Sequence, residues 1–433
     1  MKKNIFFIIL GTLIFSGCVY YNTFFNAKKY FAEAQEIGLK ENGKPTSNAI
    51  NNYNKAIKKC GVVLSDYKDS KYADDALFLM ARSLFYIGRN YTQAIEKFED
   101  LIKFYPESEF AADAKIYIAR AKYEFGKKQE AYDLLQEFLL EKECEDHHPK
   151  ALEVMANFQL KNQDYIEAEY YLAKIIENYP EYDEYERIFF LLGKTKNESG
   201  NYKESNEVFT SLLKSRVSKK VKLDSRYFIA YNYLLQKDYK QSKKFINKLL
   251  KDEYRESNIS KIQLLKARIL TGLEETDKAI PIFETVINDN KRTMLSAEAS
   301  FYLAELYFNQ LKDYTKAIEY YNNVKKENSN SDFVTRSVKK SAIASQIIQY
   351  YNPDATITTE TLVLQQLKLA EYYIESLNMP DSAIIVYDKI VGQKKDLIAK
   401  LDSLNLQMSN MNSILDSLLT QDSLLVQTMQ DSL

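Results

Sequence analysis

The residue types best suited to metal binding lie together in one short stretch. Cys144 precedes His147 and His148, which are the only two histidines among the 433 residues. A stable zinc site requires three or four protein ligands, and no second cluster of ligands lies near this stretch in the sequence. The chain also lacks a glycine-rich phosphate loop, a serine nucleophile elbow and a His-Glu-x-x-His motif. We therefore predict no metal site, no catalytic site, no cofactor and no enzymatic activity.

Two of the three cysteines, Cys60 and Cys144, could form a disulfide in an oxidising compartment. Cys60 falls on a predicted buried helix face, two helix pairs before Cys144. Stacked helix pairs at that separation lie farther apart than the roughly 7 Å between Cα atoms that a disulfide tolerates. We therefore predict that Cys60 is a free, buried thiol.

The third cysteine, Cys18, ends a segment with the features of a bacterial export signal. Two N-terminal lysines supply a positive start, and residues 5–15 form an apolar run that is too short to cross a bilayer comfortably. The sequence Phe-Ser-Gly-Cys resembles the lipobox of bacterial lipoproteins, with Phe15 in place of the usual Leu. The resemblance implies that residues 1–17 are a cleaved signal peptide and that Cys18 is acylated. The alternatives are an ordinary signal peptide with an incidental cysteine, or an uncleaved anchor.

Acylation at Cys18 would hold the protein on a membrane. Two or more acyl chains anchor a protein stably, because each buried CH₂ contributes about 0.8 kcal/mol. The lipobox implies a Gram-negative cell envelope. In some lipoproteins an Asp after the cysteine causes retention in the inner membrane, and this chain has Val19 there. The resemblance therefore implies an outer-membrane lipoprotein that faces the periplasm.

A recurring column of basic and aromatic residues could bind a peptide with an acidic group or a free carboxylate. The column follows the small residue of each first helix in a series of helix pairs, and aromatic residues lie three or four positions later. The predicted partner-binding groove consists of Arg82, Phe85, Tyr86, Arg120, Tyr123, Lys194, Tyr231, Arg268 and Phe308. The alternative is an ordinary solvated helix face.

Repeated helix pairs must position this column, and the repeat is visible in the sequence. Small residues recur about every 37 residues in the second helices, at Ala94, Ala131, Ala168, Ser205, Ser242, Ala279 and Ala317. Apolar residues follow four and seven positions later, as at Phe98 and Leu101, and another small residue lies 12 or 13 positions earlier, as at Ala81. The i, i+4, i+7 stripe is typical of one buried helix face.

This pattern resembles the tetratricopeptide repeat, which has a period of about 34 residues. A small residue lets two helices approach closely, and an apolar residue one turn later fills the groove between them. We therefore predict an all-α tetratricopeptide-repeat solenoid, a right-handed superhelix of about eight to nine helix pairs, over residues 48–391, with irregular structure at 330–360. The same register predicts that Ala168 is buried and that Glu169 faces solvent.

Two segments flank the predicted array. Residues 18–47 are expected to form the anchor and an aromatic-rich N-terminal helix, which either caps the first repeat or places its rings at the lipid headgroups. Residues 392–433 are expected to form a heptad-like tail. Its apolar residues alternate spacings of four and three, at Leu397, Leu401, Leu404, Met408, Met411, Leu415 and Leu418. This tail could pair with a coiled-coil partner, or be partly disordered.

The composition excludes one class of function. The net charge is −1, whereas a general nucleic-acid binder needs a basic surface, so we predict no nucleic-acid partner. The 11 Gly and 7 Pro also leave little room for strands joined by tight turns.

A lipobox followed by these repeats resembles the BamD-like lipoproteins of the outer-membrane β-barrel assembly machine. The local match is strongest from Tyr91 to Ala114. The chain departs from that family in having more repeats and a heptad tail. The resemblance implies a membrane-anchored scaffold that binds envelope or outer-membrane proteins during barrel assembly. The alternative is a structural organiser of another envelope machine, for secretion, motility or cell-wall synthesis.

Overall fold

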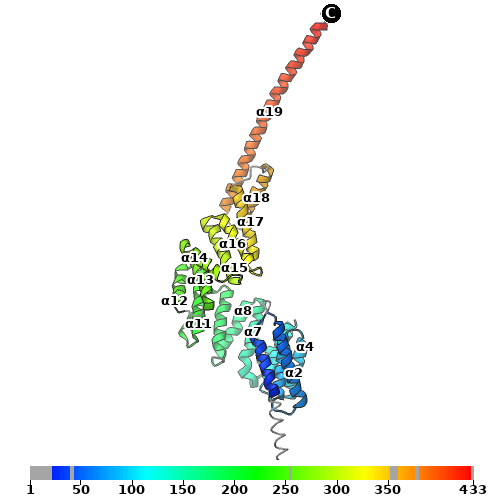
Figure 1. The fold of residues 1–433 in the computed structure, drawn as a ribbon, viewed down its shortest axis with the longest axis vertical. Helices are drawn as coiled ribbons and strands as arrows, with labels where there is room; N and C mark the ends of the chain where they lie inside the picture. The colour runs from blue at the N-terminus through cyan, green and yellow to red at the C-terminus, as the bar shows by residue number, and fades with distance from the viewer. Residues whose placement is uncertain (1–21, 40–42, 253–255, 352–358, 376–379, 431–433) are drawn as a thin grey trace, which may run out of the picture. The chain divides into compact units, whose positions relative to one another are not determined.

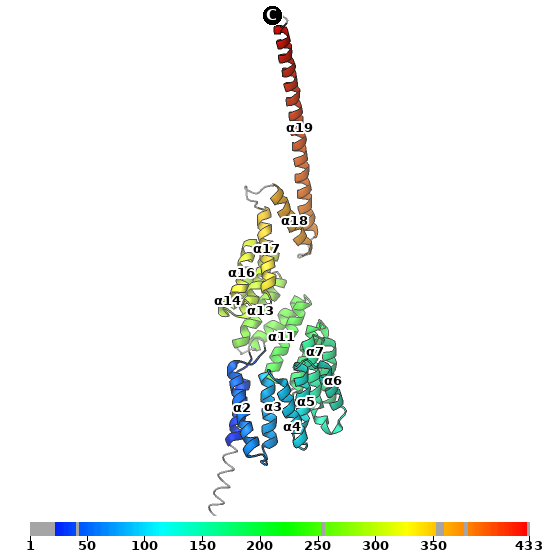
Figure 2. The ribbon, with the colours of Figure 1, turned by 90° about the vertical axis from the view of Figure 1, so that its right-hand side faces the viewer.

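The computed structural model describes residues 22–39, 43–252, 256–351, 359–375 and 380–430 (Figures 1 and 2). Cys18 and the predicted signal peptide lie outside the described residues. The chain divides into two compact units, Met1–Gln236 and Lys237–Leu433. Each unit has its own buried cores.

The first unit is built from helices joined by short turns. A helix over residues 22–36 packs against the helix that follows it. The elements after it are α2 (Ser47–Asp66), α3 (Ala73–Ile87), α4 (Tyr91–Phe104), α5 (Ala111–Glu124), α6 (Lys128–Phe138), the 3₁₀ helix η1 (Lys142–His147), α7 (His148–Asn162), α8 (Tyr165–Asn178), α9 (Tyr185–Glu198), α10 (Tyr202–Lys214) and α11 (Lys219–Leu235).

The second unit continues the same alternation of helices. Its elements are α12 (Tyr239–Asp252), α13 (Glu256–Gly272), α14 (Thr276–Asp289), α15 (Met294–Leu306), the π-helical turn η2 (Tyr307–Leu311), α16 (Tyr314–Glu327), α17 (Val334–Tyr351), α18 (Thr359–Glu375) and α19 (Pro380–Gln430). Consecutive helices such as α13 and α14, or α15 and α16, pack side by side. The final helix pair is α18 with the start of α19, where Ala370 and Ala383 are buried.

The predicted columns form the interior of both units. All seven small residues of the second helices have no exposed surface, and the apolar residues four and seven positions later are also buried. In the first helices Ala81, Ala119 and Ala156 are equally buried. The structure therefore confirms the all-α repeat architecture that the spacing predicts.

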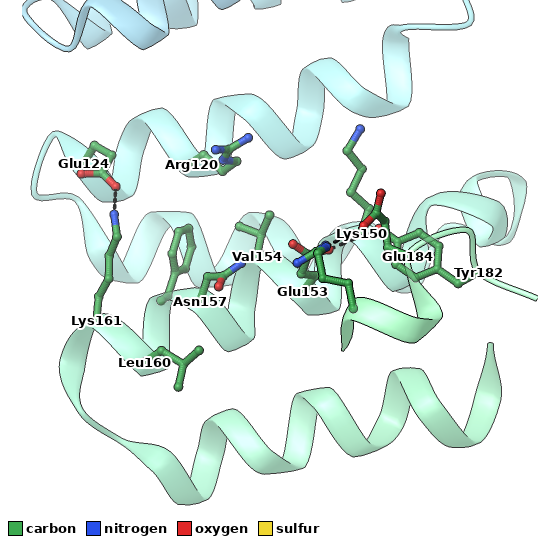
Figure 3. Close-up of a pocket in the computed structure, with 12 residues that line it drawn as sticks. Arg120, Glu124, Lys150, Glu153, Val154, Asn157, Leu160, Lys161, Tyr182 and Glu184 are labelled. Carbon is green, nitrogen blue, oxygen red and sulfur yellow. Dashed lines mark hydrogen bonds and ion pairs between the residues drawn. The ribbon is translucent and has the colours of Figure 1, made fainter. Parts of the chain in front are cut away.

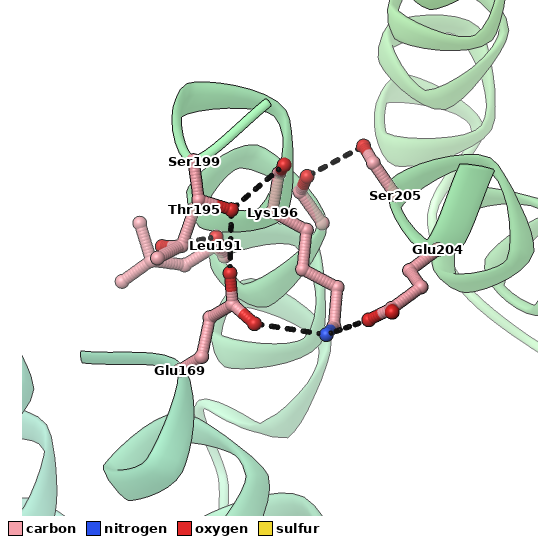
Figure 4. Close-up of polar contacts among 8 residues, drawn as sticks. Glu169, Leu191, Thr195, Lys196, Ser199, Glu204 and Ser205 are labelled. Carbon is pink, nitrogen blue, oxygen red and sulfur yellow. Dashed lines mark hydrogen bonds and ion pairs between the residues drawn. The ribbon is translucent and has the colours of Figure 1, made fainter. Parts of the chain in front are cut away.

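Gly193 shows why the columns alternate small and large residues. A Cβ atom at Gly193 would lie 2.7 Å from the ring of Phe209 on the next helix. The Ser205 hydroxyl donates a hydrogen bond of 2.7 Å to the Gly193 carbonyl, one turn before Phe209 (Figure 4). Side chains of α10 therefore lie directly against the backbone of α9 at this point, a close approach that small residues at positions 193 and 205 permit.

Polar residues at the turns fix where the second helices begin. The side chains of Asn90, Asp164 and Asp313 accept hydrogen bonds from backbone N–H groups in the first turns of α4, α8 and α16. Such N-caps satisfy donors that have no partner within the helix. The turn before α4 also needs Gly88, whose φ of 69° is in the left-handed region that favours glycine.

Glu169 does not face solvent as the register predicts. Its carboxylate accepts hydrogen bonds from Lys196 at 2.9 Å and from Ser199 at 2.7 Å, and Lys196 also contacts Glu204 at 2.6 Å (Figure 4). Burial disfavours the charged Lys196, but these two carboxylates raise its pKa. Lys196 therefore joins α8, α9 and α10, a long-range contact that helix periodicity does not reveal.

The buried small column gives a direct stability prediction. Replacing Ala168 with Leu should lower the free energy of unfolding by about 1–3 kcal/mol, because the added methylenes overpack a fully buried position. The exposed Glu177, on the same helix, is the matched control, and Glu177→Leu should change stability by less than about 0.5 kcal/mol. Urea denaturation followed by circular dichroism measures both. Equal shifts for the two variants would show that the register is wrong.

The aromatic N-terminal helix caps the first repeat. Phe24 and Phe31 are buried in the same core as Tyr53 and Cys60, so these rings are not available to lipid headgroups. Cys60 is fully buried, and burial raises the pKa of its thiol to about 12. Neither Cys60 nor Cys144 forms a disulfide within the described residues.

The predicted tail continues the last repeat helix without a break. Helix α19 runs through the expected boundary at residue 392 (Figure 1). From Leu397 to Leu419 its large apolar side chains are all exposed. Within the described parts of the chain, no helix combines the length and hydropathy that a membrane span requires.

Candidate protein-binding surface

The first helices of neighbouring pairs contact one another in the first unit. Helix α3 packs against α5, α5 packs against α7, and α9 packs against α11. Residues at equivalent positions of these helices therefore lie on adjacent parts of one surface. Arg82 on α3 and Arg120 on α5 occupy such equivalent positions.

Arg82 lies among aromatic rings. Its guanidinium carbon is 4.7 Å from the centroid of Phe31, 5.6 Å from that of Phe78 and 5.7 Å from that of Tyr117. Its Nε atom is buried and has no hydrogen-bond acceptor among the described residues. Cation–π contacts of this kind hold a guanidinium in place without neutralising its charge.

Arg120 is held in the same way, one helix pair later. Its guanidinium carbon lies 4.9 Å from the ring centroid of Phe85 and 4.7 Å from that of Tyr117. Tyr117 therefore contacts both guanidinium groups. In the described part of the chain, no carboxylate lies within ion-pair distance of Arg82 or Arg120.

The positive charges of Arg82 and Arg120 affect the pKa of a neighbouring tyrosine, Tyr86. The hydroxyls of Tyr86 and Tyr117 lie 3.2 Å apart. Burial opposes ionisation of Tyr86, but its hydrogen bond with Tyr117 and the charges of Arg120 and Arg82 together lower its pKa. Burial raises the pKa of Tyr117 to about 12. The two arginines therefore favour the ionised form of Tyr86, whereas burial outweighs their effect at Tyr117.

A cavity of about 670 Å³ opens beside Arg120 (Figure 3). It lies between α5, α7 and the segment that joins α8 to α9. The residues that line it are Arg120, Glu124, Lys150, Glu153, Val154, Asn157, Phe158, Leu160, Lys161, Tyr182, Glu184 and Arg187. The volume and the mixture of apolar and charged side chains suit several residues of a peptide.

Most charges around this cavity neutralise one another. Arg187 pairs with Glu153 and Glu184, each at 2.6 Å, and Lys161 pairs with Glu124. Lys150 pairs at 2.6 Å with Asp113, which lies on α5. Among the lining cations in the described residues, Arg120 is left without a carboxylate partner. Its guanidinium donors are therefore available to a ligand.

Three of the predicted groove residues are core residues instead. Phe85, Tyr123 and Phe308 are 8%, 6% and 3% exposed, so a partner cannot reach their rings. Tyr123 stacks on Phe158 at 3.8 Å and donates a hydrogen bond to the Phe158 carbonyl. The sequence pattern predicts that these residues line the groove wall, but their large rings are packed in the interior of the helix array.

The remaining predicted residues are spread over both units. In the first unit Lys194 lies 5.9 Å from the ring centroid of Phe228, and Tyr231 stacks with Tyr227. In the second unit Arg268 stacks on Tyr302 at 4.0 Å and pairs with Glu298 at 3.5 Å. Because Arg268 already has a carboxylate partner, Arg82 and Arg120 are the better candidates for anion binding.

The sequence prediction missed most of the residues around the cavity. Glu153 and Lys161 lie one helical turn before and after Asn157, which is in the same column as Arg82 and Arg120. Extending that column by one turn in each direction would have found them. Tyr182 and Arg187 lie near the start of α9, and no periodic signal marks them.

The histidine stretch has a structural role. His148 lies 3.0 Å from the carbonyl oxygen of Glu141, and its ring packs against Phe138. No group of three or more metal-ligating side chains occurs in the residues that the structure describes.

Comparison with known proteins agrees with this architecture. Tetratricopeptide-repeat family profiles match residues 75–108 and 264–332. No curated protein matches the chain. Several solved structures are similar in fold, and some of them are from bacteria. The pilF protein of Pseudomonas aeruginosa is 18% identical over 55% of this chain and 94% of its own length, with a TM-score of 0.36.

A second bacterial structure is the C-terminal part of a tetratricopeptide-repeat protein from Cytophaga hutchinsonii. It is 18% identical over 61% of this chain and 98% of its own length, with a TM-score of 0.43. Yeast Tom70 is 16% identical over 76% of this chain and 66% of its own length, with a TM-score of 0.46. At these identities the similarity concerns the fold alone. The chain is an all-α tetratricopeptide-repeat solenoid, and such repeats indicate a protein–protein interaction scaffold.

Proposed function

We propose that this protein is a membrane-anchored interaction scaffold of the bacterial cell envelope, and that it holds a carboxylate-bearing segment of a partner protein against Arg120. One observation carries the proposal. Arg120 lines a cavity of about 670 Å³, its guanidinium makes cation–π contacts with two rings, and no carboxylate among the described residues pairs with it.

The geometry of Arg120 suits carboxylate recognition. The contacts with the rings of Phe85 and Tyr117 do not neutralise the charge of the guanidinium, and a guanidinium can bind a carboxylate through two parallel N–H···O hydrogen bonds. The rings also hold the side chain in one place, so little conformational entropy is lost when a ligand binds. The cavity is lined by both positive and negative side chains. It would therefore favour a partner segment that also carries polar groups, because such a segment can complement both signs of charge.

The sequence supports a location for this scaffold. Cys18 ends the lipobox-like segment, so acylation would attach the protein to a membrane, and Val19 favours the outer membrane. The repeats would then face the periplasm, as in the BamD-like lipoproteins that the sequence resembles. On this proposal the partners are outer-membrane proteins or their peptides during barrel assembly.

A second candidate function is the organisation of another envelope machine, for secretion, motility or cell-wall synthesis. The exposed apolar side chains of α19 favour this candidate, because the BamD-like lipoproteins lack such a tail. The two candidates differ in the identity of the partner and not in the mode of binding.

Site-specific cross-linking would separate them. A photo-reactive amino acid at Asn157, which lines the cavity, should form an adduct with a partner in intact cells, whereas the same group at exposed Glu177 should not. Mass spectrometry of the adduct identifies the partner. The main β-barrel subunit of the assembly machine would support barrel assembly, and a component of another envelope machine would support the second candidate. Absence of any adduct at Asn157 would remove the cavity from both proposals.

A further inference from the structure

Helix α19 carries a continuous apolar stripe that nothing in the described residues covers. Seven side chains form this stripe, which we call the tail seam: Leu397, Leu401, Leu404, Met408, Met411, Leu415 and Leu418. They are between 48% and 66% exposed. Their alternating spacing of four and three places them at the a and d positions of successive heptads.

Intrinsic helix propensity does not explain this helix. Between Asp402 and Ser417 the chain contains four serines and three asparagines, which favour helices less than Ala, Leu, Glu or Lys do. Most helical stability in proteins comes from packing of an amphipathic face. A helix of this composition therefore needs an occupant on its tail seam.

The flanks of the tail seam favour an identical helix as the occupant. The flanking e and g positions hold Ile398, Lys400, Asn405, Gln407, Asn412, Ile414 and Leu419, of which Lys400 alone is charged. Coiled coils that select a different partner use charged residues at these positions. In a parallel pair of identical helices, each g residue faces the e residue five positions later. Gln407 of one helix then faces Asn412 of the other, which pairs two amides. Ile414 likewise faces Leu419, which pairs two apolar side chains.

The charge distribution argues against a membrane surface as the occupant. Interfacial helices are rich in Lys and Arg on their polar face, which attract anionic lipids. No Lys or Arg occurs from Leu401 to the last residue, and the polar face carries Asp402 and Asp416.

We infer that the tail seam is a self-association surface, where α19 packs against the tail seam of a second copy of this chain. This inference is independent of the carboxylate-binding proposal. A dimer joined through its α19 helices would carry two sets of repeats. A partner with two binding segments would then bind the dimer more tightly than it binds a single chain.

The chain offers a matched pair of substitutions. Leu404 is on the tail seam and is 56% exposed, whereas Leu406 is 65% exposed and lies about 200° around the helix from it. The mass of full-length protein in detergent, measured by light scattering over a range of concentrations, should correspond to more than one chain. Leu404→Asp should raise the concentration needed for association about tenfold or more, and Leu406→Asp should leave it unchanged.

Three outcomes would overturn the inference. The first is a wild-type protein that stays monomeric at every concentration. A second is an equal effect of the two substitutions on association. The third is a Leu404→Asp variant that lowers the melting temperature of the monomer, because this would place the occupant of the tail seam within the same chain.

Discussion

Replacing Cys18 with Ala should move the protein from the membrane fraction to the soluble fraction. The expected effect is large, because the acyl chains on this cysteine would supply the anchor. Labelled palmitate should be incorporated by the wild type and not by Cys18→Ala. Fractionation of the same cells then measures the release.

Cys144→Ala is the matched control for this experiment. Cys144 is partly exposed and therefore open to adventitious acylation, yet it lies outside the lipobox-like segment. The variant should keep both the palmitate label and the membrane location. A wild-type protein that takes up no palmitate would end the lipoprotein hypothesis, and a Cys18→Ala protein that stays on the membrane would show a second anchor.

The core of this fold is predictable from sequence because it depends on local spacing. Ala94, Phe98 and Leu101 lie on one face of α4, and that face recurs in each second helix. Close contact between two helices requires a small residue at the position of Ala94, and this requirement does not depend on the rest of the sequence. The same rule explains why glycine at position 193 and serine at position 205 replace alanine without loss of the pattern.

The surface is less predictable because each contact there joins residues far apart in the chain. Glu169 follows a buried alanine, so helix periodicity predicts that it is solvated, but its partners Lys196 and Ser199 come from the next helix pair. In the same way Arg268 and Arg120 occupy equivalent positions. Only Arg268 has a carboxylate, Glu298, brought near by the following pair.

The aromatic residues of the predicted groove show a second limit. Helical periodicity assigns Phe85 and Tyr123 to the face that carries Arg82 and Arg120. A large side chain at the margin of that face, however, can rotate away from the solvent and into the interface between two helix pairs. The ring of Tyr123 does so by stacking on Phe158 of the next pair. The sequence therefore located the two arginines on one surface but not the cavity beside them.

Replacing Arg120 with Gln should weaken partner binding by roughly ten- to a hundredfold. Hydrogen bonds to a charged group contribute about 1.5–3 kcal/mol, and Gln keeps a donor but loses the charge and the bidentate geometry. Arg120 is outside the core, so circular dichroism of the variant should match that of the wild type. Arg89 is an exposed arginine in the turn between α3 and α4, and Arg89→Gln is the matched control.

The affinity for the partner identified by cross-linking shows whether Arg120 binds a carboxylate of that partner. Isothermal titration of that purified partner into the full-length wild type, Arg120→Gln and Arg89→Gln should be performed at low and high salt. We expect the wild type and Arg89→Gln to bind equally, with an affinity that falls with salt, and Arg120→Gln to bind weakly with a smaller salt dependence. A correctly folded Arg120→Gln protein that binds the partner as tightly as the wild type would contradict this expectation, and would place the binding surface elsewhere.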